Sequence, residues 1–394
     1  MRKKTVRDID VSGKRALVRV DFNVPLDEAG RILDDLRIRA ALPTIQYLRD
    51  LQAKVILCSH LDRPNGKVVE SLRLAPIASR LGELLSATIA TASDCVGSEA
   101  EAAVAALGGG GMLLLENLRF HPEEEANDPE FAQRLASLAD LFVNDAFGAA
   151  HRAHASTAGV TRYLPSVAGL LMEREIDYLS RCVAEPERPL GVIIGGAKIS
   201  DKLACLHYLL PNVDVLVIGG GMANTFLKAN GHSVGESLTE DDQLEVANAF
   251  MKGAAERDTQ LLLPVDVVIA DTFAADARAR TEPAESVPND WRIMDVGPRS
   301  VAAYSEQLQR CRTVVWSGPL GVAEFPQFAR GSESLARMLA SLDAVTVVGG
   351  GETAALVREA GLADKFNHIS TGGGAFLEFL EGRELPGVAA LLDR

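Results

Sequence analysis

The feature that most constrains the fold is an alternation of short apolar runs with longer helical patterns along the chain. Gly, Pro or polar residues bound each apolar run, and such residues end regular structure. Apolar strands that alternate with helices predict parallel βαβ units, with helices on both faces of each sheet. The expected strands are Ala16–Val20, Lys54–Cys58, Met112–Leu115, Leu141–Val143, Leu190–Ile194, Val213–Ile218, Val267–Ile269, Thr313–Trp316 and Ala344–Val348, and helical stretches include 74–85, 129–139 and 243–257.

The length of 394 residues suggests two or three domains of about 150 residues each. A helical stretch, MEREIDYLSRCV, runs into Pro186 and Pro189, which would end it. We therefore expect an α/β fold with two doubly wound, Rossmann-like lobes over 1–172 and 189–378, joined by a hinge helix and linker over 173–188. Ligands of such sheets bind at the carboxyl ends of the strands.

Charge and cysteine usage exclude several classes of protein. The formal charge is −14, whereas a nucleic-acid surface needs a concentrated basic footprint. No apolar run approaches the roughly 18 residues that a membrane span needs, and the basic N-terminus lacks the apolar stretch of a secretory signal. The five cysteines are scattered without a CxxC pair, as in proteins with reduced thiols. We expect a soluble cytoplasmic protein that binds neither nucleic acid nor membranes.

Arginine or histidine follows most of the predicted strands in the first part of the chain. Several arginines that converge on one crevice suit a small, multiply charged anion, because guanidinium binds phosphate and carboxylate in bidentate fashion and keeps its charge. A lone Arg is usually a solvated surface residue, His154 could be structural, and Asp21 could form an Asx turn. The repetition favours a shared anion site. The segments are RVDFNVP (19–25), LRIRAALPTI (36–45), SHLDRP (59–64), ENLRF (116–120) and HRAH (151–154).

Glycines follow the strands of the second part instead, at 195–196, 219–221 and 349–351. A glycine turn lets a ligand approach the backbone, and the helix N-terminus behind it favours phosphate. Lys198 and Lys202 are four residues apart, so we expect both ammonium groups on one face of a helix, where they suit a polyphosphate. Neither the Walker A spacing nor the dinucleotide fingerprint is present, and a close approach of helix to strand would explain each glycine run equally well.

Taken together, these and further segments resemble the phosphoglycerate kinase family along essentially the whole chain, in order and in spacing. The matching segments are RVDFNVPL (19–26), RIRAALPTI (37–45), SHLDRPNG (59–66), LLLENLRF (113–120), VNDAFGAAHRAHAST (143–157), GGAKISDK (195–202), IGGGMANTFLK (218–228), WSGPLGVAEF (316–325), VVGGGETA (347–354) and STGGGAFLEFLEG (370–382).

The resemblance implies a glycolytic phosphotransferase with a carboxyl group as acceptor. ATP and 3-phosphoglycerate would give ADP and 1,3-bisphosphoglycerate reversibly, with Mg²⁺. The N-terminal lobe would bind the glycerate, the C-terminal lobe would bind the nucleotide, and the segment 379–394 would return to the N-terminal lobe. Members of the family are usually monomers.

The resemblance also implies roles for individual residues, which are transferred only where the motifs match. His151 and His154 would flank the glycerate, and the backbone amides of 372–374 would lie near the path of transfer. Lys198 would accompany the transferring phosphoryl group, and Lys202 would hold nucleotide phosphates. The glycerate contacts would be Asp21, Asn23, Arg37, His60, Arg63, Arg119 and Arg152; Glu324 would hold the ribose; Gly350, Gly351, Glu352 and Thr353 would meet the phosphates, with Glu352 reaching the metal.

The implied reaction needs no general base, because the acceptor is already a carboxylate. Catalysis would consist of alignment and neutralisation of the spread negative charge. Arg37 of one lobe and Lys198 of the other can enclose the phosphoryl group only if the lobes approach, and closure would exclude water.

Two other classes of protein stay open as alternatives. A dehydrogenase-like dinucleotide enzyme would also have doubly wound lobes, although the chain lacks its glycine fingerprint. A binding protein without activity would keep the fold, although intact Arg37, Lys198 and Lys202 argue against it. The chain also departs from the common pattern of the family at Asp62, Thr272, Ser317 and Glu352.

Overall fold

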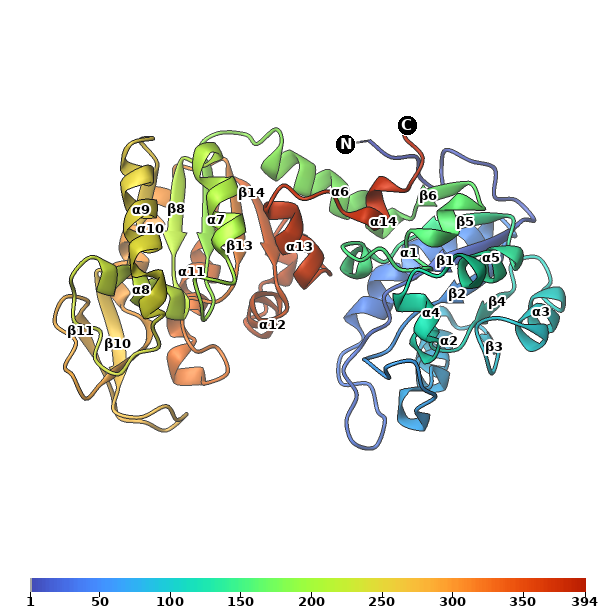
Figure 1. The fold of residues 1–394 in the computed structure, drawn as a ribbon, viewed down its shortest axis with the longest axis horizontal. Helices are drawn as coiled ribbons and strands as arrows, with labels where there is room; N and C mark the ends of the chain where they lie inside the picture. The colour runs from blue at the N-terminus through green and yellow to red at the C-terminus, as the bar shows by residue number, and fades with distance from the viewer. Residues whose placement is uncertain (1) are drawn as a thin grey trace. The chain divides into compact units, whose positions relative to one another are not determined.

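The computed structural model describes residues 2–394, which divide into two compact units. Unit 1 contains the chain up to Asp177 together with Glu384–Arg394, and unit 2 contains Tyr178–Arg383 (Figure 1). Each unit has a parallel six-stranded sheet flanked by helices, which confirms the predicted α/β class. Among residues 2–394, no helix is both long and apolar enough to cross a bilayer.

The sheet of unit 1 has the strand order β3-β4-β2-β1-β5-β6, and every pair in it is parallel. Its central strands are buried on both faces because their inner residues are apolar, as ALV in RALVR and VIL in KVILC. The strands are β1 (Arg15–Arg19), β2 (Lys54–Cys58), β3 (Ala90–Thr91), β4 (Met112–Leu114), β5 (Leu141–Asn144) and β6 (Ser166–Ala168).

The helix that begins at Pro129 has residues that suit a helix start. Asp128 accepts a hydrogen bond of 2.9 Å from the amide of Phe131, and Pro129 occupies the first turn. The boundary between the units lies within α6. The helices are α1 (Leu36–Asp50), α2 (Ala75–Leu85), α3 (Ser98–Ala105), α4 (Pro122–Glu125), α5 (Pro129–Ser137), α6 (Leu170–Val183) and α14 (Pro386–Ala389), with 3-10 turns η1 (Glu70–Leu72), η2 (Leu118–Phe120), η3 (Phe147–Ala149) and η4 (Gly159–Arg162).

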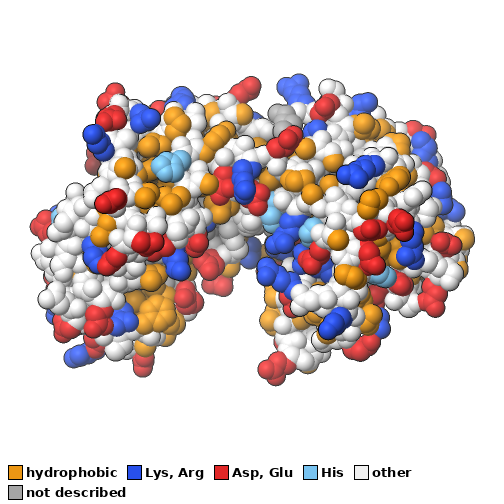
Figure 2. Space-filling model, viewed as in Figure 1, with side chains coloured by type: hydrophobic (Ala, Val, Ile, Leu, Met, Phe, Trp, Pro, Cys, Tyr) orange, Lys and Arg blue, Asp and Glu red, His pale blue; other side chains and the backbone are white. Residues whose placement is uncertain are grey.

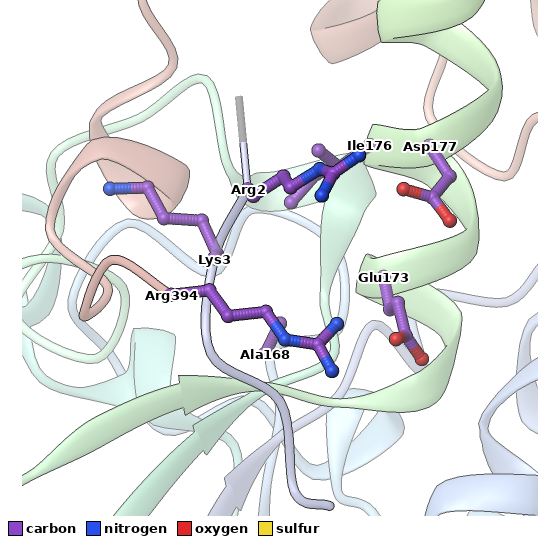
Figure 3. A pocket seen from close by; sticks show the side chains of 7 residues that line it. All are labelled: Arg2, Lys3, Ala168, Glu173, Ile176, Asp177 and Arg394. Atoms are coloured by element: carbon purple, nitrogen blue, oxygen red, sulfur yellow. The ribbon is translucent and has the colours of Figure 1, made fainter. Parts of the chain in front are cut away.

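The C-terminal segment 384–394 belongs to unit 1 and lies beside the N-terminal segment (Figure 1). Lys3 and Asp393 form a β-bridge, and the amide of Leu392 donates to the carbonyl of Ser166 at 3.0 Å. A cavity of about 200 Å³ lies where both termini meet α6. Figure 3 shows the side chains of Arg2 and Arg394 directed toward α6, which carries Glu173 and Asp177. Because both signs of charge line this cavity, it does not have the character of an anion site.

The main sheet of unit 2 has the strand order β15-β14-β13-β7-β8-β9 and is parallel. A separate antiparallel sheet has the order β11-β10-β12. The strands are β7 (Leu190–Ile194), β8 (Val215–Ile218), β9 (Gln260–Leu262), β10 (Asp266–Ala270), β11 (Ala279–Pro283), β12 (Arg292–Val296), β13 (Thr313–Ser317), β14 (Val345–Gly349) and β15 (His368–Ile369).

The antiparallel sheet corrects one prediction. The apolar run at Val267–Ile269 does form a strand, β10, but it does not join the parallel series. Only residues 271–278 and 284–291 connect β10, β11 and β12, and these connections are too short for the helical crossover that parallel strands need.

The helices of unit 2 are α7 (Leu203–Leu209), α8 (Gly220–Ala229), α9 (Leu244–Ala255), α10 (Pro298–Leu308), α11 (Arg330–Leu339), α12 (Gly351–Glu359) and α13 (Gly373–Leu380), with 3-10 turns η5 (Leu210–Asn212), η6 (Asp241–Gln243), η7 (Pro326–Phe328) and η8 (Ala363–Lys365).

Both parallel sheets contain a point where the strand order reverses. In unit 1, β1 has β2 on one side and β5 on the other; in unit 2, β7 has β8 on one side and β13 on the other. Loops that leave neighbouring strands in opposite directions open a crevice at the carboxyl ends of these strands, which is where ligands of such sheets bind. The predicted site residues follow these strands or their neighbours β4 and β14, except Arg37, which lies on α1.

Candidate active site

In unit 1, the loops after β1 and β2 are fastened to the first turn of α1. Arg37 Nη1 lies 3.1 Å from both carboxylate oxygens of Asp21 and donates to the carbonyl of Asn23 at 3.0 Å. Oδ1 of Asn23 accepts a hydrogen bond of 2.8 Å from the amide of Asp62. Asp21 therefore has two functions at once, because its Oδ1 also accepts from the amide of Asn23 in the expected Asx turn, at 3.2 Å.

Arg119, on η2 after β4, extends the same cluster. Its Nη1 donates to the carbonyl of Asp62 at 2.8 Å, and its Nε lies 3.0 Å from Glu125. Burial lowers the pKa of Arg119, with Glu125 opposing that effect and the charges of Arg19 and Arg152 adding to it. These neighbouring charges place Arg119 and Arg152 in one electrostatic environment.

The remaining arginines of the predicted set are exposed. Arg152 donates from Nε to Nε2 of His151 at 3.2 Å. Arg63, after β2, makes no hydrogen bond or ion pair with any side chain of the described residues. Figure 2 shows Lys, Arg and His side chains gathered on unit 1. A cationic group that is exposed and free of a carboxylate can accept a phosphate or carboxylate ligand without first breaking an ion pair.

His154 is buried and does not carry a charge at neutral pH. Its Nδ1 lies 3.8 Å from Oε1 of Glu124, and burial together with Arg19 and Arg119 lowers its pKa to about 4. A neutral, buried histidine beside the cluster fits the structural alternative that the sequence left open.

Asp62 occupies a backbone conformation that glycine adopts more readily than other residues. Its φ is 53°, in the left-handed region that glycine adopts without strain and that Asp tolerates better than most residues. The backbone of Asp62 meets Asn23 and Arg119, whereas its side chain is exposed and forms no ion pair with residues 2–394. The backbone of Asp62 thus belongs to the cluster, whereas its carboxylate is not paired with the arginines there.

Sequence reasoning missed a buried set behind the arginines, namely Arg19, Glu124 and Ser156. Arg19 is 1% exposed and Glu124 is 0% exposed, and Ser156 lies between them. The signal was the charged residue in the apolar strand RALVR, because a charge is almost never fully buried unless it is paired.

In unit 2, the two lysines do not lie on a helix, which corrects the prediction for Lys198 and Lys202. Helix α7 begins only at Leu203, with Lys202 at its N-cap, and Lys198 lies in the loop after β7. The residues between Gly196, which has a φ of 135°, and Lys202 form bends and turns before the helix begins. Neither lysine forms an ion pair with any of residues 2–394, so both positive charges are available to an anion.

Close backbone packing explains several of the glycines in unit 2. A Cβ at Gly318 would lie 2.3 Å from the carbonyl oxygen of Gly195, and a Cβ at Gly220 would lie 2.6 Å from the amide nitrogen of Gly196. The glycine turns after β7, β8 and β13 therefore pack backbone against backbone. These glycines serve the fold, as the alternative explanation of the glycine runs proposed.

The glycines after β14 are different. A Cβ at Gly351 would meet nothing within 4 Å, and one at Gly373 would come no closer than 3.9 Å to the amide nitrogen of Gly351. Helices α12 and α13 thus begin close together, beside open space. Gly350 is the N-cap of α12, and Thr353 Oγ1 accepts from the amide of Gly318 at 2.8 Å from a fully buried position. Two adjacent helix N-termini favour an anion in that space.

A cavity of about 450 Å³ lies in unit 2 beside these turns. Apolar side chains such as Leu238, Met294 and Val322 line one part of it, and the backbones of the glycine turns line another. Glu324 and Glu352 are exposed, border the cavity and form no ion pair with the described residues. An apolar part joined to a polar rim is typical of a small-molecule site, and the apolar part suits a flat heterocycle.

One group of side chains in the described residues approaches the arrangement of metal ligands, and it lies in unit 1. The ligand atoms of Asp94, Cys95 and His121 lie within 4.8 Å of one another. Oδ1 of Asp94 already accepts hydrogen bonds of 2.6 Å from His121 Nε2 and from the amide of Cys95. Burial raises the pKa of the Cys95 thiol well above its usual value, and a metal would need the thiolate. The hydrogen bond between Asp94 and His121 therefore connects the segments that carry these two residues, and the group does not need a metal for this role.

The comparisons with known proteins agree with each other. A family model described as phosphoglycerate kinase matches residues 6–383. A relative named phosphoglycerate kinase in Pelotomaculum thermopropionicum is 58% identical over 394 residues, and one in Moorella thermoacetica is 57% identical over 394 residues. Each of these alignments covers 100% of this chain and of the relative.

Solved structures give the same result. The phosphoglycerate kinase of Coxiella burnetii matches with a TM-score of 0.89 at 41% identity, and that of Pyrococcus horikoshii matches with a TM-score of 0.86 at 32% identity. Both matches cover 98% of this chain and 98% of the solved one. The chain belongs to the phosphoglycerate kinase family.

Proposed function

We propose that this chain transfers a phosphoryl group reversibly between ATP and the carboxylate of 3-phosphoglycerate in glycolysis, with ADP and 1,3-bisphosphoglycerate as products. The observation that carries the proposal is that the cationic groups assigned to catalysis and phosphate binding, Arg37, Lys198 and Lys202, are all present in a chain with the family's fold. Because glycolysis is a cytoplasmic pathway, we place the activity in the cytoplasm, and we propose that the enzyme acts as a monomer.

The glycerate binds to unit 1 in this proposal. Arg63 and Arg152 are exposed and meet the phosphate or carboxylate directly, whereas Arg37 and Arg119 are held in place by Asp21 and Asp62. Asn23 and His60 complete the set and contact the glycerate from neighbouring loops. Guanidinium groups suit this ligand because they bind both of its anionic groups in bidentate fashion.

The nucleotide binds to unit 2 in this proposal. The base occupies the apolar part of the cavity beside Leu238 and Met294, and Glu324 accepts from the ribose hydroxyls. Lys202 and the amides at the start of α12, from Gly350 and Gly351 to Thr353, hold the phosphates.

The donor set at the start of α12 fits a magnesium ion. Glu352 is an exposed carboxylate without an ion-pair partner among residues 2–394, and Mg²⁺ in such sites takes carboxylate and phosphate oxygens. Glu352 would hold the metal against the nucleotide phosphates, where it would neutralise negative charge. A carboxylate at that position would otherwise repel a bare polyphosphate.

The chemical step then depends on position and charge. The acceptor carboxylate is already nucleophilic, so no side chain has to remove a proton. Arg37 and Lys198 neutralise the charge that spreads over the equatorial oxygens in the transition state. Because the two substrates bind to different units, transfer requires that the units bring them together and exclude water during the reaction.

A coupled assay tests the proposal. The chain is supplied with ATP, Mg²⁺ and 3-phosphoglycerate, and the acyl phosphate is reduced by an auxiliary dehydrogenase that consumes NADH. We expect turnover that depends on all three components. NADH consumption without the auxiliary enzyme would indicate a dehydrogenase instead, and binding of both ligands without turnover would indicate a binding protein.

A further inference from the structure

The last residue of the central strand β1, Arg19, has no role in the proposed reaction so far. Its side chain is 1% exposed and therefore does not contact solvent. Its Nε donates to Ser156 Oγ at 2.8 Å, its Nη1 donates to the carbonyl of Val20 at 2.5 Å, and its Nη2 lies 3.0 Å from Nδ1 of His60.

The contact with Arg19 determines where His60 carries its proton. A guanidinium group has only donors and does not lose its proton in a protein, so Nδ1 of His60 must accept. The proton of the neutral imidazole then resides on Nε2. An imidazolium would place an N–H against the guanidinium and add a second positive charge, and burial together with Arg19, Arg119 and Arg37 holds the pKa of His60 well below its usual range.

Arg19 is itself held by a buried chain of hydrogen bonds through Ser156 to Glu124, called the relay below. Ser156 Oγ donates to Glu124 Oε1 at 2.6 Å, so the oxygen lone pairs of the hydroxyl face Arg19. The amide of Ser156 donates to Glu124 Oε2 at 2.9 Å, and Glu124 is 0% exposed. The carboxylate offsets the buried guanidinium charge, and a buried pair of this kind is stable only when its hydrogen bonds are satisfied. The relay therefore fixes the guanidinium, and the guanidinium fixes the ring.

The opposite side of the His60 ring is available to a ligand. Nε2 of His60 has no hydrogen-bond partner among the residues that the structure describes, although the ring is only 5% exposed. Carboxylate and phosphate oxygens accept hydrogen bonds and cannot donate when ionised. The Nε2–H form can therefore bind them, whereas the other tautomer would present a lone pair and repel them.

We propose that Arg19 is a positioning residue that locks His60 in the neutral Nε2–H tautomer, so that the imidazole offers one N–H donor to an oxygen of the bound glycerate. This inference rests on the proposed function, because it uses His60 as a glycerate contact. Arg19 itself does not touch the substrate.

Nitrogen NMR of the full chain labelled with ¹⁵N-histidine tests the lock without any variant of Arg19. The His60→Gln variant assigns the ring signals of His60 by their disappearance. We expect the Nε2–H tautomer between pH 5.5 and 8 with no titration, and a shift of the Nε2 signal on addition of 3-phosphoglycerate. An Nδ1–H or imidazolium form at pH 7 would overturn the proposal.

The Arg19→Gln variant tests the consequence for binding, with Arg15→Gln as a matched control. Both remove an arginine from β1, but Arg15 forms an exposed ion pair with Asp140. In Arg19→Gln we expect a mixture of His60 tautomers and an increase of about tenfold in the KM for 3-phosphoglycerate, as for the loss of one buried hydrogen bond. The KM for ATP should change less than twofold, and Arg15→Gln should behave as wild type.

The outcomes separate the two proposals. If Arg19→Gln keeps a pure Nε2–H tautomer and an unchanged KM for 3-phosphoglycerate, the positioning role is wrong while the kinase activity stands. If the wild-type chain shows the lock but no turnover and no response of His60 to 3-phosphoglycerate, the proposed function fails. Should Arg19→Gln not fold, the wild-type spectrum alone still decides whether the lock exists.

Discussion

Oδ1 of Asn23 accepts a hydrogen bond of 2.8 Å from the backbone amide of Asp62, and the carbonyl of Asp62 in turn accepts one from Arg119 at 2.8 Å. The backbone amide and the backbone carbonyl of Asp62 are thus both hydrogen-bonded to residues of the proposed glycerate site. The left-handed backbone of Asp62 is stabilised by these bonds, while its carboxylate stays exposed. The loop after β2 is therefore positioned by its backbone and not by its charge.

Removal of the charge at Asp62 should improve substrate binding slightly. We expect Asp62→Asn to lower the KM for 3-phosphoglycerate about twofold at low ionic strength, because Asn also tolerates the left-handed region and a nearby negative charge repels the anion. The difference should vanish at high salt, where exposed charges are screened. Asp50→Asn, which removes an exposed carboxylate at the end of α1, should change nothing; an equal effect of both variants would contradict the argument.

Two glycines should respond differently to the same substitution. The free energy of unfolding of Gly351→Ala should stay within about 0.5 kcal/mol of the wild-type value, because a Cβ there meets no atom within 4 Å. Its KM for ATP should nevertheless rise, because the methyl group enters the space proposed for the phosphates. Gly318→Ala should lose at least about 2 kcal/mol, because its φ is 90° and its Cβ would lie 2.3 Å from a carbonyl oxygen. Urea unfolding and steady-state kinetics measure both effects. An unstable Gly351→Ala protein would show that this glycine serves the fold.

Asp145 should make the stability of unit 1 depend on pH. This carboxyl is 0% exposed, accepts from the amides of Leu171 and Met172 at the start of α6, and its pKa is raised by burial to about 6, from 3.8. The raised value means that its contribution to stability is present below pH 4 and lost as the pH rises through 6. Asp145→Asn should therefore raise the free energy of unfolding by roughly 2 kcal/mol at pH 8 and by little at pH 4.

The control for this experiment has the opposite sign. The hydrogen bond from Arg15 lowers the pKa of Asp140, so the contribution of Asp140 is present at neutral pH and lost as the pH falls. Asp140→Asn should destabilise the chain at pH 8 and less at pH 3. Urea unfolding at several pH values compares the two variants. A gain in Asp145→Asn that is the same at every pH would exclude ionisation as its cause.

Glu352 should determine the requirement for magnesium. Glu352→Asp keeps a carboxylate and should need a Mg²⁺ concentration similar to that of wild type for half-maximal activity. Glu352→Gln removes the charge that a hard cation prefers and should need much more Mg²⁺. If the Gln variant has unchanged Mg²⁺ dependence, the carboxylate merely complements the dipole of α12, a contribution of only about 0.3–1 kcal/mol.

The central strands of both sheets could be predicted because each contains a short apolar run bounded by polar residues, Gly or Pro. Lys54–Cys58 and Leu190–Ile194 were predicted with the bounds that the structure gives to β2 and β7. The short strands β3 and β15 have two residues each, too few to show a pattern. The polar strand β11, ARTEP, carries no apolar signal because it lies exposed on a separate sheet.

The candidate site could be predicted less completely than the fold. Motifs identified Arg37 and Lys198, but the spacing of Lys198 and Lys202 suggested a helix, whereas the folded chain forms bends and turns there until α7 begins at Leu203. The pairing of Arg19 with Ser156 and Glu124 joins residues more than one hundred positions apart, and only the folded chain brings them together. The left-handed backbone of Asp62 and its hydrogen bonds to Asn23 and Arg119 likewise could not be predicted from the residue type.

The most direct test of the account is the kcat of Arg37→Ala and Lys198→Ala with both substrates saturating. The account assigns to each group the neutralisation of charge in the transition state, and loss of one such group typically costs about 10²–10³ in kcat. We expect that loss in each variant, while circular dichroism and the urea midpoint stay near those of wild type. A near-normal kcat in both folded variants would contradict the account.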